Sequence, residues 1–511
     1  MAVPFVLATL ARRGLLRPGP PADVMRQFTA LRRWGFSLAG ELRQAAARDP
    51  GLLAVVDERR AVTYHELLER AGRLARALRG AVGVEPGDRV GVLCRNSAGM
   101  IEALVAVTSL GADAVLINTG LSGPQLCTVA REQELQALIH DDEFELPTCL
   151  DGIGEARLEE LIDGAPPGEL APPEHAGRTI VLTSGTTGIP KGALRRTPGG
   201  FGPLCSMIDR IPLRVGDRVL IAAPLFHTWG YAGLQIAMAL RATVVLRRRF
   251  EPAAASAAMV REKCTALIAV PVMLQQLMES APAGPRPPLR VVAVSGSALP
   301  GGLATRFMDR YGDVLYNVYG STEVSWASIA TPADLRAAPN TAGRPPHGTR
   351  TVVLDETGRP LPAGTVGRLF VGNEMLFDGY SDGTSRERHD GLLDTGDLGH
   401  LDAAGRVFVD GREDDMIVSG GENVFPAEVE NLLADLPQVR EVAVIGVPDA
   451  QYGERLAAYL VPHPGEILGP EQVRDHVRRH LARFCVPRDV VFQPSLPRNA
   501  TGKVLTRDLP R

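Results

Sequence analysis

The amino-acid sequence predicts an α/β protein. We expect a large N-terminal domain of doubly wound sheets with a small barrel-like subdomain, followed by a small α+β C-terminal domain. The chain has 511 residues, more than one hydrophobic core usually contains. Up to about residue 340, short apolar segments alternate with helical patterns, which is typical of parallel sheets covered by helices on both faces. Short strands and turns follow after Gly343, and the pattern changes again near Arg412.

The N-terminal elements follow one another in a regular order. Thr63 to Glu66 forms a capping box, and apolar residues from Leu67 to Leu78 recur at helical spacing. Residues 97–110 have the pattern of a further helix. The predicted strands are 89–93, 114–117, 137–140, 179–182, 219–222, 243–246, 266–270 and 291–294. Ligands of such sheets bind at the carboxyl ends of the strands, so the loop after residue 182 becomes a candidate site.

The C-terminal third has a different pattern of predicted strands and helices. Strands are expected at 351–355, 367–371, 398–401 and 407–409, with a hairpin turn at 402–405. From Arg412 onward a helix at 427–434, strands at 439–447 and 456–461, and a helix at 471–483 suggest a separate α+β unit. We therefore predict domains 1–411 and 412–511. The Pro- and Gly-rich segments 162–177 and 282–288 are predicted surface loops.

Charge and cysteine content argue against several classes of function. The 55 basic and 59 acidic residues give a net charge of −4, which does not favour nucleic acid as a partner. The six cysteines include no C-x-x-C pair, so free thiols in a reducing cytoplasm are expected, without a zinc site or a disulfide framework. The N-terminal apolar run of about eight residues is too short for a transmembrane segment. It either docks on the main domain or makes a weak membrane-surface contact.

The strongest single motif is TSGTTGIPKG, from Thr183 to Gly192. A loop of Gly, Ser and Thr that leaves a strand can present backbone N–H groups and hydroxyls to a phosphate, and Lys191 adds positive charge. The string is not a Walker A motif, because Lys191 follows Pro190 and precedes Gly192. An ordinary Gly-rich turn is the alternative, but the full string favours contact with nucleotide phosphates.

Four further strings are NVYGSTE (317–323), DTGD (394–397), GREDDMIVSGGEN (411–423) and LPRNATGK (496–503). Together with the first motif, in this order and spacing, they resemble the adenylate-forming superfamily of acyl-CoA synthetases, luciferases and peptide-synthetase adenylation domains. The resemblance covers roughly residues 40 to 508. The string PLFHTWG from Pro224 and the string SGGENVFPAEVE from Ser419 are similar to stand-alone bacterial fatty-acid–CoA ligases and related natural-product acyl-CoA synthetases.

This resemblance implies an ATP and Mg²⁺ site. It places Glu323 and Thr183 at the metal, Thr322 at the α-phosphate, Tyr319 on adenine and Asp397 on the ribose hydroxyls. The implied phosphate-loop residues are Thr183, Ser184, Gly185, Thr186, Thr187, Gly188 and Lys191. Further implied nucleotide contacts are Gly296, Ser297, Asn317, Gly320, Ser321, Val409, Arg412 and Lys503. The implied catalytic residues are Lys503, Glu323, Thr183 and His227.

The resemblance also implies an acyl pocket and a mobile C-terminal domain. The domain would rotate about Asp414 between two half-reactions, removing Lys503 from the site and bringing in a loop that receives coenzyme A. The implied loop residues are Ser419, Gly420, Gly421 and Glu422. The implied acyl-binding residues are Phe226, His227, Trp229, Gly230, Val294, Ser295, Val318 and Gly320.

The expected reaction activates a carboxylate as acyl-AMP with release of pyrophosphate and then transfers the acyl group to coenzyme A. We expect a hydrophobic acid, because the strings near the pocket offer no evident cation or carboxylate for an amino acid. Its identity as a fatty, aryl or terpenoid acid stays open, as does a homodimer. Three alternatives remain: an acyl-AMP ligase that serves a carrier protein, a non-catalytic sensor of acyl-AMP or ATP, and a luciferase-like oxygenase.

Overall fold

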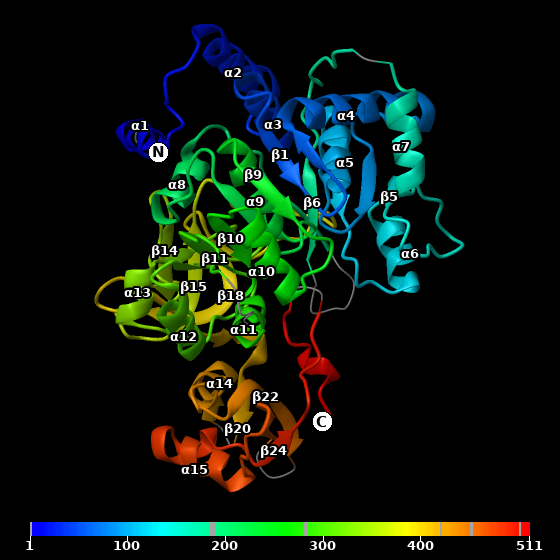
Figure 1. Cartoon of the computed structure of the whole chain (residues 1–511). Helices are drawn as coiled ribbons and strands as arrows, with labels where there is room; N and C mark the ends of the chain where they lie inside the picture. Colours follow the sequence, from blue (N-terminus) through cyan, green and yellow to red (C-terminus); the bar gives the residue numbers. More distant parts are fainter. Residues whose placement is uncertain are drawn as a thin grey trace.

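The computed structural model describes residues 3–166, 168–183, 191–280, 285–419, 422–449, 453–499 and 502–510. A large N-terminal unit contains two mostly parallel sheets and one antiparallel sheet, and a smaller C-terminal unit has a sheet of its own. Figure 1 shows the C-terminal unit, in orange and red, at one end of the large unit. The predicted fold class is confirmed.

The first large sheet has eight strands in the order β13-β12-β11-β10-β8-β9-β1-β2. The inner strands are parallel, and the two edge strands pair antiparallel with their neighbours. Its central strands are buried apolar segments, as expected for a sheet with both faces covered. The strands are β1 (Leu53–Val56), β2 (Ala61–Thr63), β8 (Arg218–Ile221), β9 (Thr243–Leu246), β10 (Ala266–Ala269), β11 (Val291–Val294), β12 (Leu315–Tyr319) and β13 (Ser328–Ala330).

The second large sheet has six strands in the order β16-β7-β6-β4-β3-β5. Four of them are parallel, whereas β7 returns antiparallel beside β6 and pairs Lys191 with Thr183. The predicted phosphate loop therefore connects two neighbouring strands of a hairpin. The strands are β3 (Arg89–Leu93), β4 (Asp113–Leu116), β5 (Leu135–His140), β6 (Thr179–Thr183), β7 (Lys191–Leu194) and β16 (Gly379–Tyr380).

Helices cover both large sheets (Figure 1). The predicted capping box is present, since Thr63 accepts from the Glu66 backbone and Glu66 accepts from the Thr63 backbone. Helix α5 is buried on all sides, between β3 and β4 in the chain. The helices are α1 (Val3–Arg12), α2 (Pro21–Trp34), α3 (Leu38–Arg48), α4 (Tyr64–Ala77), α5 (Ala98–Ser109), α6 (Gly123–Glu132), α7 (Glu155–Gly164), α8 (Gly202–Arg210), α9 (Thr228–Ala239), α10 (Pro252–Arg261), α11 (Pro271–Glu279), α12 (Gly301–Tyr311) and α13 (Pro332–Ala337), with a π-helical turn at Leu78–Val82.

The small subdomain is an antiparallel sheet, as predicted. Its order is β14-β15-β18-β17, with β19 also paired to β18. The turn at residues 402–405 closes the β18–β19 hairpin, where the backbone N–H of Asp402 donates to the Arg406 carbonyl. The strands are β14 (Arg350–Leu354), β15 (Gly367–Gly372), β17 (Arg388–His389), β18 (Leu392–Leu401) and β19 (Val407–Arg412).

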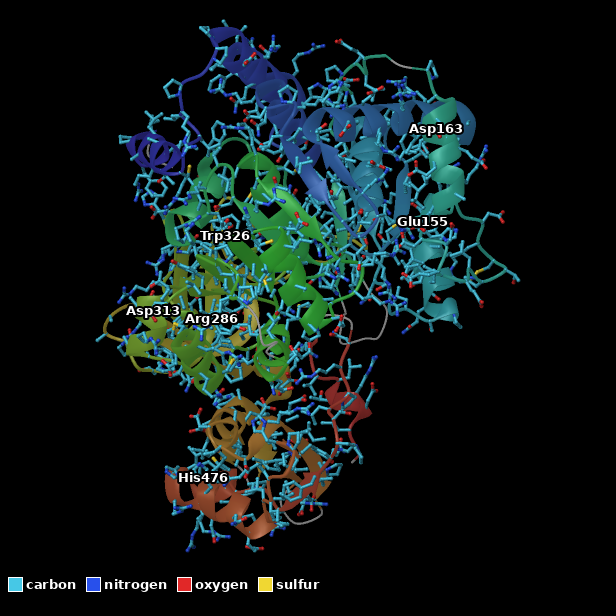
Figure 2. The ribbon with its side chains drawn as sticks, viewed as in Figure 1. Glu155, Asp163, Arg286, Asp313, Trp326 and His476 are labelled. Atoms are coloured by element: carbon cyan, nitrogen blue, oxygen red, sulfur yellow. A yellow bond between two sulfur atoms is a disulfide. The ribbon has the colours of Figure 1, made fainter. Side chains whose placement is uncertain are left out.

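The C-terminal unit packs two helices on a five-stranded sheet around Val429, Leu433, Val473 and Val477. In Figure 2, His476 marks α15, far from Glu155 and Asp163 of α7 in the large unit. Gln275 on α11 donates to the Arg440 carbonyl at 2.7 Å, which joins the two units. The elements are β20 (Ile417–Ser419), β21 (Glu422–Val424), α14 (Pro426–Ala434), β22 (Val439–Asp449), β23 (Gly453–Pro462), α15 (Pro470–His480) and β24 (Asp489–Phe492), with 3₁₀ turns at Glu413–Asp415, Arg483–Cys485 and Thr506–Asp508.

Two sequence expectations are corrected. Cys127 and Cys149 form a disulfide where free thiols were expected, because α6 and the segment after β5 bring their Cα atoms to 6.5 Å. The other four cysteines are buried free thiols. The predicted loop 162–177 begins with the last turn of α7, which ends at Gly164.

Of the two readings of the N-terminus, the structure shows a docked segment. Helix α1 lies on α8, where Arg12 pairs with Asp209 at 2.8 Å and Arg13 donates to the Ile208 carbonyl at 2.8 Å. Leu10 is buried in this contact. Over the described residues, every helix is too short or too polar to cross a bilayer.

Candidate active site

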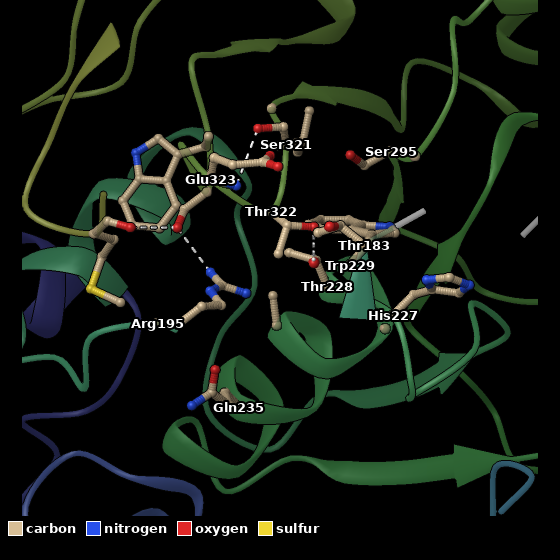
Figure 3. A pocket seen from close by; sticks show the side chains of 18 of the residues that line it. Thr183, Arg195, His227, Thr228, Trp229, Gln235, Ser295, Ser321, Thr322 and Glu323 are labelled. Carbon is tan, nitrogen blue, oxygen red and sulfur yellow. Dashed lines mark hydrogen bonds between the residues drawn. The ribbon is translucent and has the colours of Figure 1, made fainter. Parts of the chain in front are cut away.

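A cavity of about 770 Å³ lies beside the carboxyl ends of β6, β11 and β12, and it is shown from close by in Figure 3. Many of the residues predicted from the five strings share it. The predicted residues that line it are Thr183, Lys191, His227, Trp229, Gly230, Ser295, Gly296, Val318, Gly320, Ser321, Thr322, Glu323, Arg412, Asp414 and Lys503. Side chains from the two large sheets, the small subdomain and the C-terminal unit thus converge on one space.

The phosphate-loop end of the cavity is built by the β6–β7 hairpin. The Thr183 hydroxyl donates to the Lys191 carbonyl at 3.2 Å, which fixes the last residue of β6 against the first residue of β7. The Lys191 ammonium pairs with Asp382 at 2.8 Å. Ser184, Gly185, Thr186, Thr187 and Gly188 lie outside the described residues. The described part of the motif therefore contributes a hydroxyl and a cation to the cavity.

Glu323 is held by a residue that the sequence did not single out. The Tyr380 hydroxyl donates to Glu323 Oε1 at 2.6 Å, from the short strand β16. Burial and the hydrogen bond to Glu323 together raise the pKa of Tyr380 to about 12. The Lys191 ammonium also lies 5.6 Å from the centre of the Tyr380 ring. A carboxylate oriented in this way beside a phosphate loop fits a hard cation such as Mg²⁺, which needs few protein ligands.

Helix α9 begins at the centre of the cavity. Its first residue, Thr228, shares a hydrogen bond of 2.9 Å with Thr322 across the cavity (Figure 3). Gly230 is required here, because a Cβ would lie 2.1 Å from the Pro224 carbonyl oxygen. The Trp229 indole N–H donates to the Ala269 carbonyl at 3.0 Å, so this tryptophan forms part of the wall.

His227 immediately precedes α9 and lines the cavity. Burial lowers its pKa to about 4, so the imidazole is neutral at pH 7. Its Nε2 atom is buried and has no hydrogen-bond partner among the described residues. A buried neutral imidazole without a partner can exchange a hydrogen bond with a bound ligand.

A hydrogen-bonded chain lies behind the nucleotide end of the cavity. The Tyr319 hydroxyl donates to Asp397 Oδ2 at 2.6 Å, and Arg412 lies 3.5 Å from Asp397 Oδ1. Burial raises the pKa of Asp397, while Tyr319 and Arg412 oppose this rise. Burial likewise raises the pKa of Tyr319, and Asp397 raises it further. Asp397 is thus already hydrogen-bonded in the absence of a ribose.

Several predicted residues do not line the cavity. Phe226 is 4% exposed and borders a second cavity of about 330 Å³ instead. Ser419 and Glu422 are paired across the β20–β21 hairpin, and Gly420 and Gly421 lie outside the described residues. The remaining predicted residues that do not line the first cavity are Val294, Ser297, Asn317, Tyr319, Asp397 and Val409.

The C-terminal unit contributes Lys503 to the cavity, through a turn at Asn499–Lys503. The backbone N–H of Lys503 donates to the Asn499 side chain at 2.9 Å. Gly502 in this turn has a φ of +80°, and a Cβ there would lie 2.4 Å from Val272 on α11. This glycine permits the close approach of the two units that brings Lys503 to the site. Lys503 also lowers the pKa of Asp397 through its charge.

The cavity is also lined by a cation that lies outside the sequence motifs. Arg195 directly follows β7 and lines the cavity, where its Nη2 donates to Ser325 Oγ at 2.9 Å. Ser325 has a φ of +62°, which is unusual for a residue with a side chain. The strings near the pocket offered no evident cation, and Arg195 lies outside them. Arg195 is four residues after Lys191. In an extended segment, residues an even number apart point to the same face, so this spacing could have indicated that both side chains face the cavity.

Comparison with known proteins agrees with this geometry. The AMP-binding enzyme family matches residues 42–381, and the AMP-binding enzyme C-terminal domain matches residues 428–503. A feruloyl-CoA synthase of Amycolatopsis sp is 34% identical over 488 residues, covering 91% of this chain and 97% of the relative. A fatty acid–[acyl-carrier-protein] ligase, ScoC, of Streptomyces coeruleorubidus is 31% identical over 491 residues, covering 91% and 94%.

The solved structures give the same result. The o-succinylbenzoate coenzyme A synthetase of Bacillus subtilis, in complex with ATP and a magnesium ion, superposes with a TM-score of 0.81 at 30% identity, over 92% of this chain and 98% of that chain. Because the first family match alone spans most of the sequence, and the relatives align over nearly their whole length, this chain belongs to the AMP-binding enzyme family.

Proposed function

We propose that this enzyme is an ATP- and Mg²⁺-dependent acid–CoA ligase. It activates a largely hydrophobic carboxylic acid as acyl-AMP, releases pyrophosphate, and then transfers the acyl group to coenzyme A with release of AMP. One observation carries the proposal: a single cavity is lined by Thr183, Thr322 and Glu323 of the large unit and by Lys503 of the C-terminal unit. These residues would supply a phosphate contact, a carboxylate for the metal and a cation for the charge that develops in the reaction.

The cavity residues divide into groups with separate tasks in the first half-reaction. The described phosphate-loop residues Thr183 and Lys191 would bind the outer phosphates, and Thr322 the α-phosphate. Glu323 would hold the Mg²⁺ that neutralises charge on the phosphates. The ammonium of Lys503 would stabilise the charge that develops between the carboxylate and the α-phosphorus. A carboxylate and a triphosphate repel each other, so these cations make their approach favourable.

The second half-reaction is proposed to need a rearrangement of the C-terminal unit. Asp414 lies in the 3₁₀ turn directly after β19, between the two units, and pairs with Arg412 at 3.7 Å. Rotation there would withdraw Lys503 and bring in the Ser419–Glu422 segment for the thiol. The boundary between residues 411 and 412, the homodimer and a cytoplasmic location remain predictions.

The experiment that tests this function is product detection by mass spectrometry. The enzyme, ATP and Mg²⁺ are incubated with fatty, aryl and polycyclic acids, with and without coenzyme A. Acyl-CoA that forms only in the presence of coenzyme A is the expected product. Acyl-AMP that accumulates in the presence of coenzyme A would instead favour transfer to a carrier protein, as the name of the ScoC relative describes. Nucleotide binding without either product across the panel would favour the sensor alternative.

A further inference from the structure

Arg195 has no task in the two half-reactions described above. We propose that it selects an acid that carries a second carboxylate, at the end of the carbon skeleton remote from the carboxylate that reacts. The inference rests on the acid–CoA ligase function and names the substrate class of that same site. Four features of the cavity support it: a charge without an ion-pair partner, a fixed orientation, a position beside the later part of α9, and the protonated state of Glu41.

The charge of Arg195 has no ion-pair partner among the described residues; Glu323 acts on it only at longer range and opposes the fall of its pKa. Its Nη1 atom is buried without a hydrogen-bond partner, and no carboxylate of the described residues lies within ion-pair distance of the guanidinium. Burial lowers the pKa of Arg195, as expected for a covered charge, but an arginine stays protonated in proteins. A buried cation of this kind is stabilised by an anionic ligand.

The orientation of the guanidinium is fixed in advance. Nη2 donates to Ser325 Oγ at 2.9 Å, and the Ser325 hydroxyl in turn donates to the Met375 carbonyl at 2.7 Å. Because the Ser325 hydroxyl donates its proton to the Met375 carbonyl, its oxygen is left to accept from Arg195. The planar guanidinium thus keeps its Nη1 side for a ligand, and a carboxylate matches this donor geometry.

Arg195 lies beside the later part of α9, away from the start of that helix. Thr228, at the start of α9, contacts Thr322 at the reacting end. Gln235 lies seven residues further along α9, which corresponds to about 10 Å at the usual helical rise. Figure 3 shows Arg195 near Gln235, on the side of the cavity away from His227 and Ser295. The residues lining the deeper part include the apolar side chains of Pro203, Leu204, Met207, Ile236 and Ala239, which would contact the carbon skeleton.

The other acids of this cavity do not neutralise Arg195. Glu41, on α3, also lines the cavity, but burial raises its pKa to about 8, so it is protonated at pH 7. Glu323 is bound by Tyr380 and interacts with Arg195 only through its charge at longer range. With Glu41 protonated, no acid of the described residues forms an ion pair with Arg195, which favours a dianionic acid over a monoanionic acid of the same length.

The test compares matched pairs of acids that differ only at the remote end. Each pair has the same straight-chain or para-substituted aryl skeleton, ending in a carboxylate or in a methyl group. Binding is measured by calorimetry on the full chain with Mg²⁺ and a non-hydrolysable ATP analogue. For the best-fitting pair we expect the dicarboxylate to bind about 10- to 100-fold more tightly, which is typical of a hydrogen-bonded charge pair.

The variant Arg195→Met should abolish this preference, and Arg195→Lys should restore part of it. The matched control is Arg196→Met, because Arg196 is exposed and pairs with Asp378 at 2.5 Å outside the cavity. Equal or absent binding of both acids in every pair, or a preference that Arg195→Met retains, would overturn the inference. Pyrophosphate release is recorded separately. A preference without pyrophosphate release would contradict the proposed function alone, whereas release without a preference would contradict the inference alone.

Discussion

The hydroxyl of Tyr380 offers a sharp test of the metal site. Tyr380→Phe removes the oxygen that donates to Glu323 at 2.6 Å and leaves the ring in place. The ring keeps its edge contact with Phe377, at 5.0 Å between centroids, and its position beneath the Lys191 ammonium. The substitution therefore releases the Glu323 carboxylate without opening a cavity or removing the cation from the phosphate loop.

The magnitude follows from the type of bond. A hydrogen bond to a charged group contributes about 1.5–3 kcal/mol, which corresponds to a factor of roughly 10 to 100 in rate or affinity. We expect Tyr380→Phe to lower kcat/KM for pyrophosphate release by this factor and to raise the Mg²⁺ concentration needed for half-maximal rate. Thioester formation from supplied acyl-AMP and coenzyme A should change by less than about threefold, because that step does not use the outer phosphates.

The assay is a titration of free Mg²⁺ with pyrophosphate release as the readout, paired with the thioester assay. Tyr311→Phe is the control, since Tyr311 lies on α12 outside the cavity and stacks on Phe307. A Mg²⁺ dependence of Tyr380→Phe equal to that of the wild type would contradict the prediction, as would an equal fall in the rates of both half-reactions. Either result would mean that the bond to Glu323 supports the fold instead of the metal.

Three further predictions concern other parts of the molecule. Lys503→Ala should lower adenylation about 10²- to 10³-fold and spare thioester formation from supplied acyl-AMP; an equal loss in both steps would contradict its role. Asp414→Pro should restrict the backbone between the units and impair the two half-reactions unequally, and unchanged kinetics in both would remove the hinge. Burial raises the pKa of Glu41 from 4.5 to about 8, so the folded state binds the extra proton and stability falls as the pH rises through this window. Glu41→Gln should therefore raise the free energy of unfolding relative to the wild type at pH 8 and leave it unchanged at pH 4. The gain is at most about 1.4 kcal/mol for each pH unit between the two pKa values. Unfolding by urea at both pH values, with Glu132→Gln as an exposed control, checks this, and an equal difference at both pH values would count against it.

The parts that could be predicted from sequence are those encoded by neighbouring residues. The eight predicted strands of the large unit are confirmed, with ends that differ by at most two residues. Buried parallel strands are continuous apolar segments, so each is visible on its own. Strand β7 was not predicted, because it starts at Lys191 inside the motif and its role as the returning arm of a hairpin depends on pairing with β6.

The parts that could not be predicted depend on contacts between distant positions. Tyr380 meets Glu323 from 57 residues away, and Arg195 meets Ser325 across 130 residues. The Cys127–Cys149 disulfide, at a separation of 22 residues, likewise has no local signature. Arg195 also lies beside Arg196 in the sequence, and only folding shows that the first enters the cavity and the second does not.

The backbone at Ser325 has a consequence for engineering this enzyme. A left-handed conformation at a residue with a Cβ costs roughly 1–2 kcal/mol, and glycine would relieve it. Glycine would also delete the oxygen that receives Arg195 Nη2. Under the proposed role of Arg195, heat tolerance and discrimination between substrates are therefore opposed at this one position. Selection for thermal stability alone would favour glycine at this position and would give a more stable enzyme with lower substrate specificity.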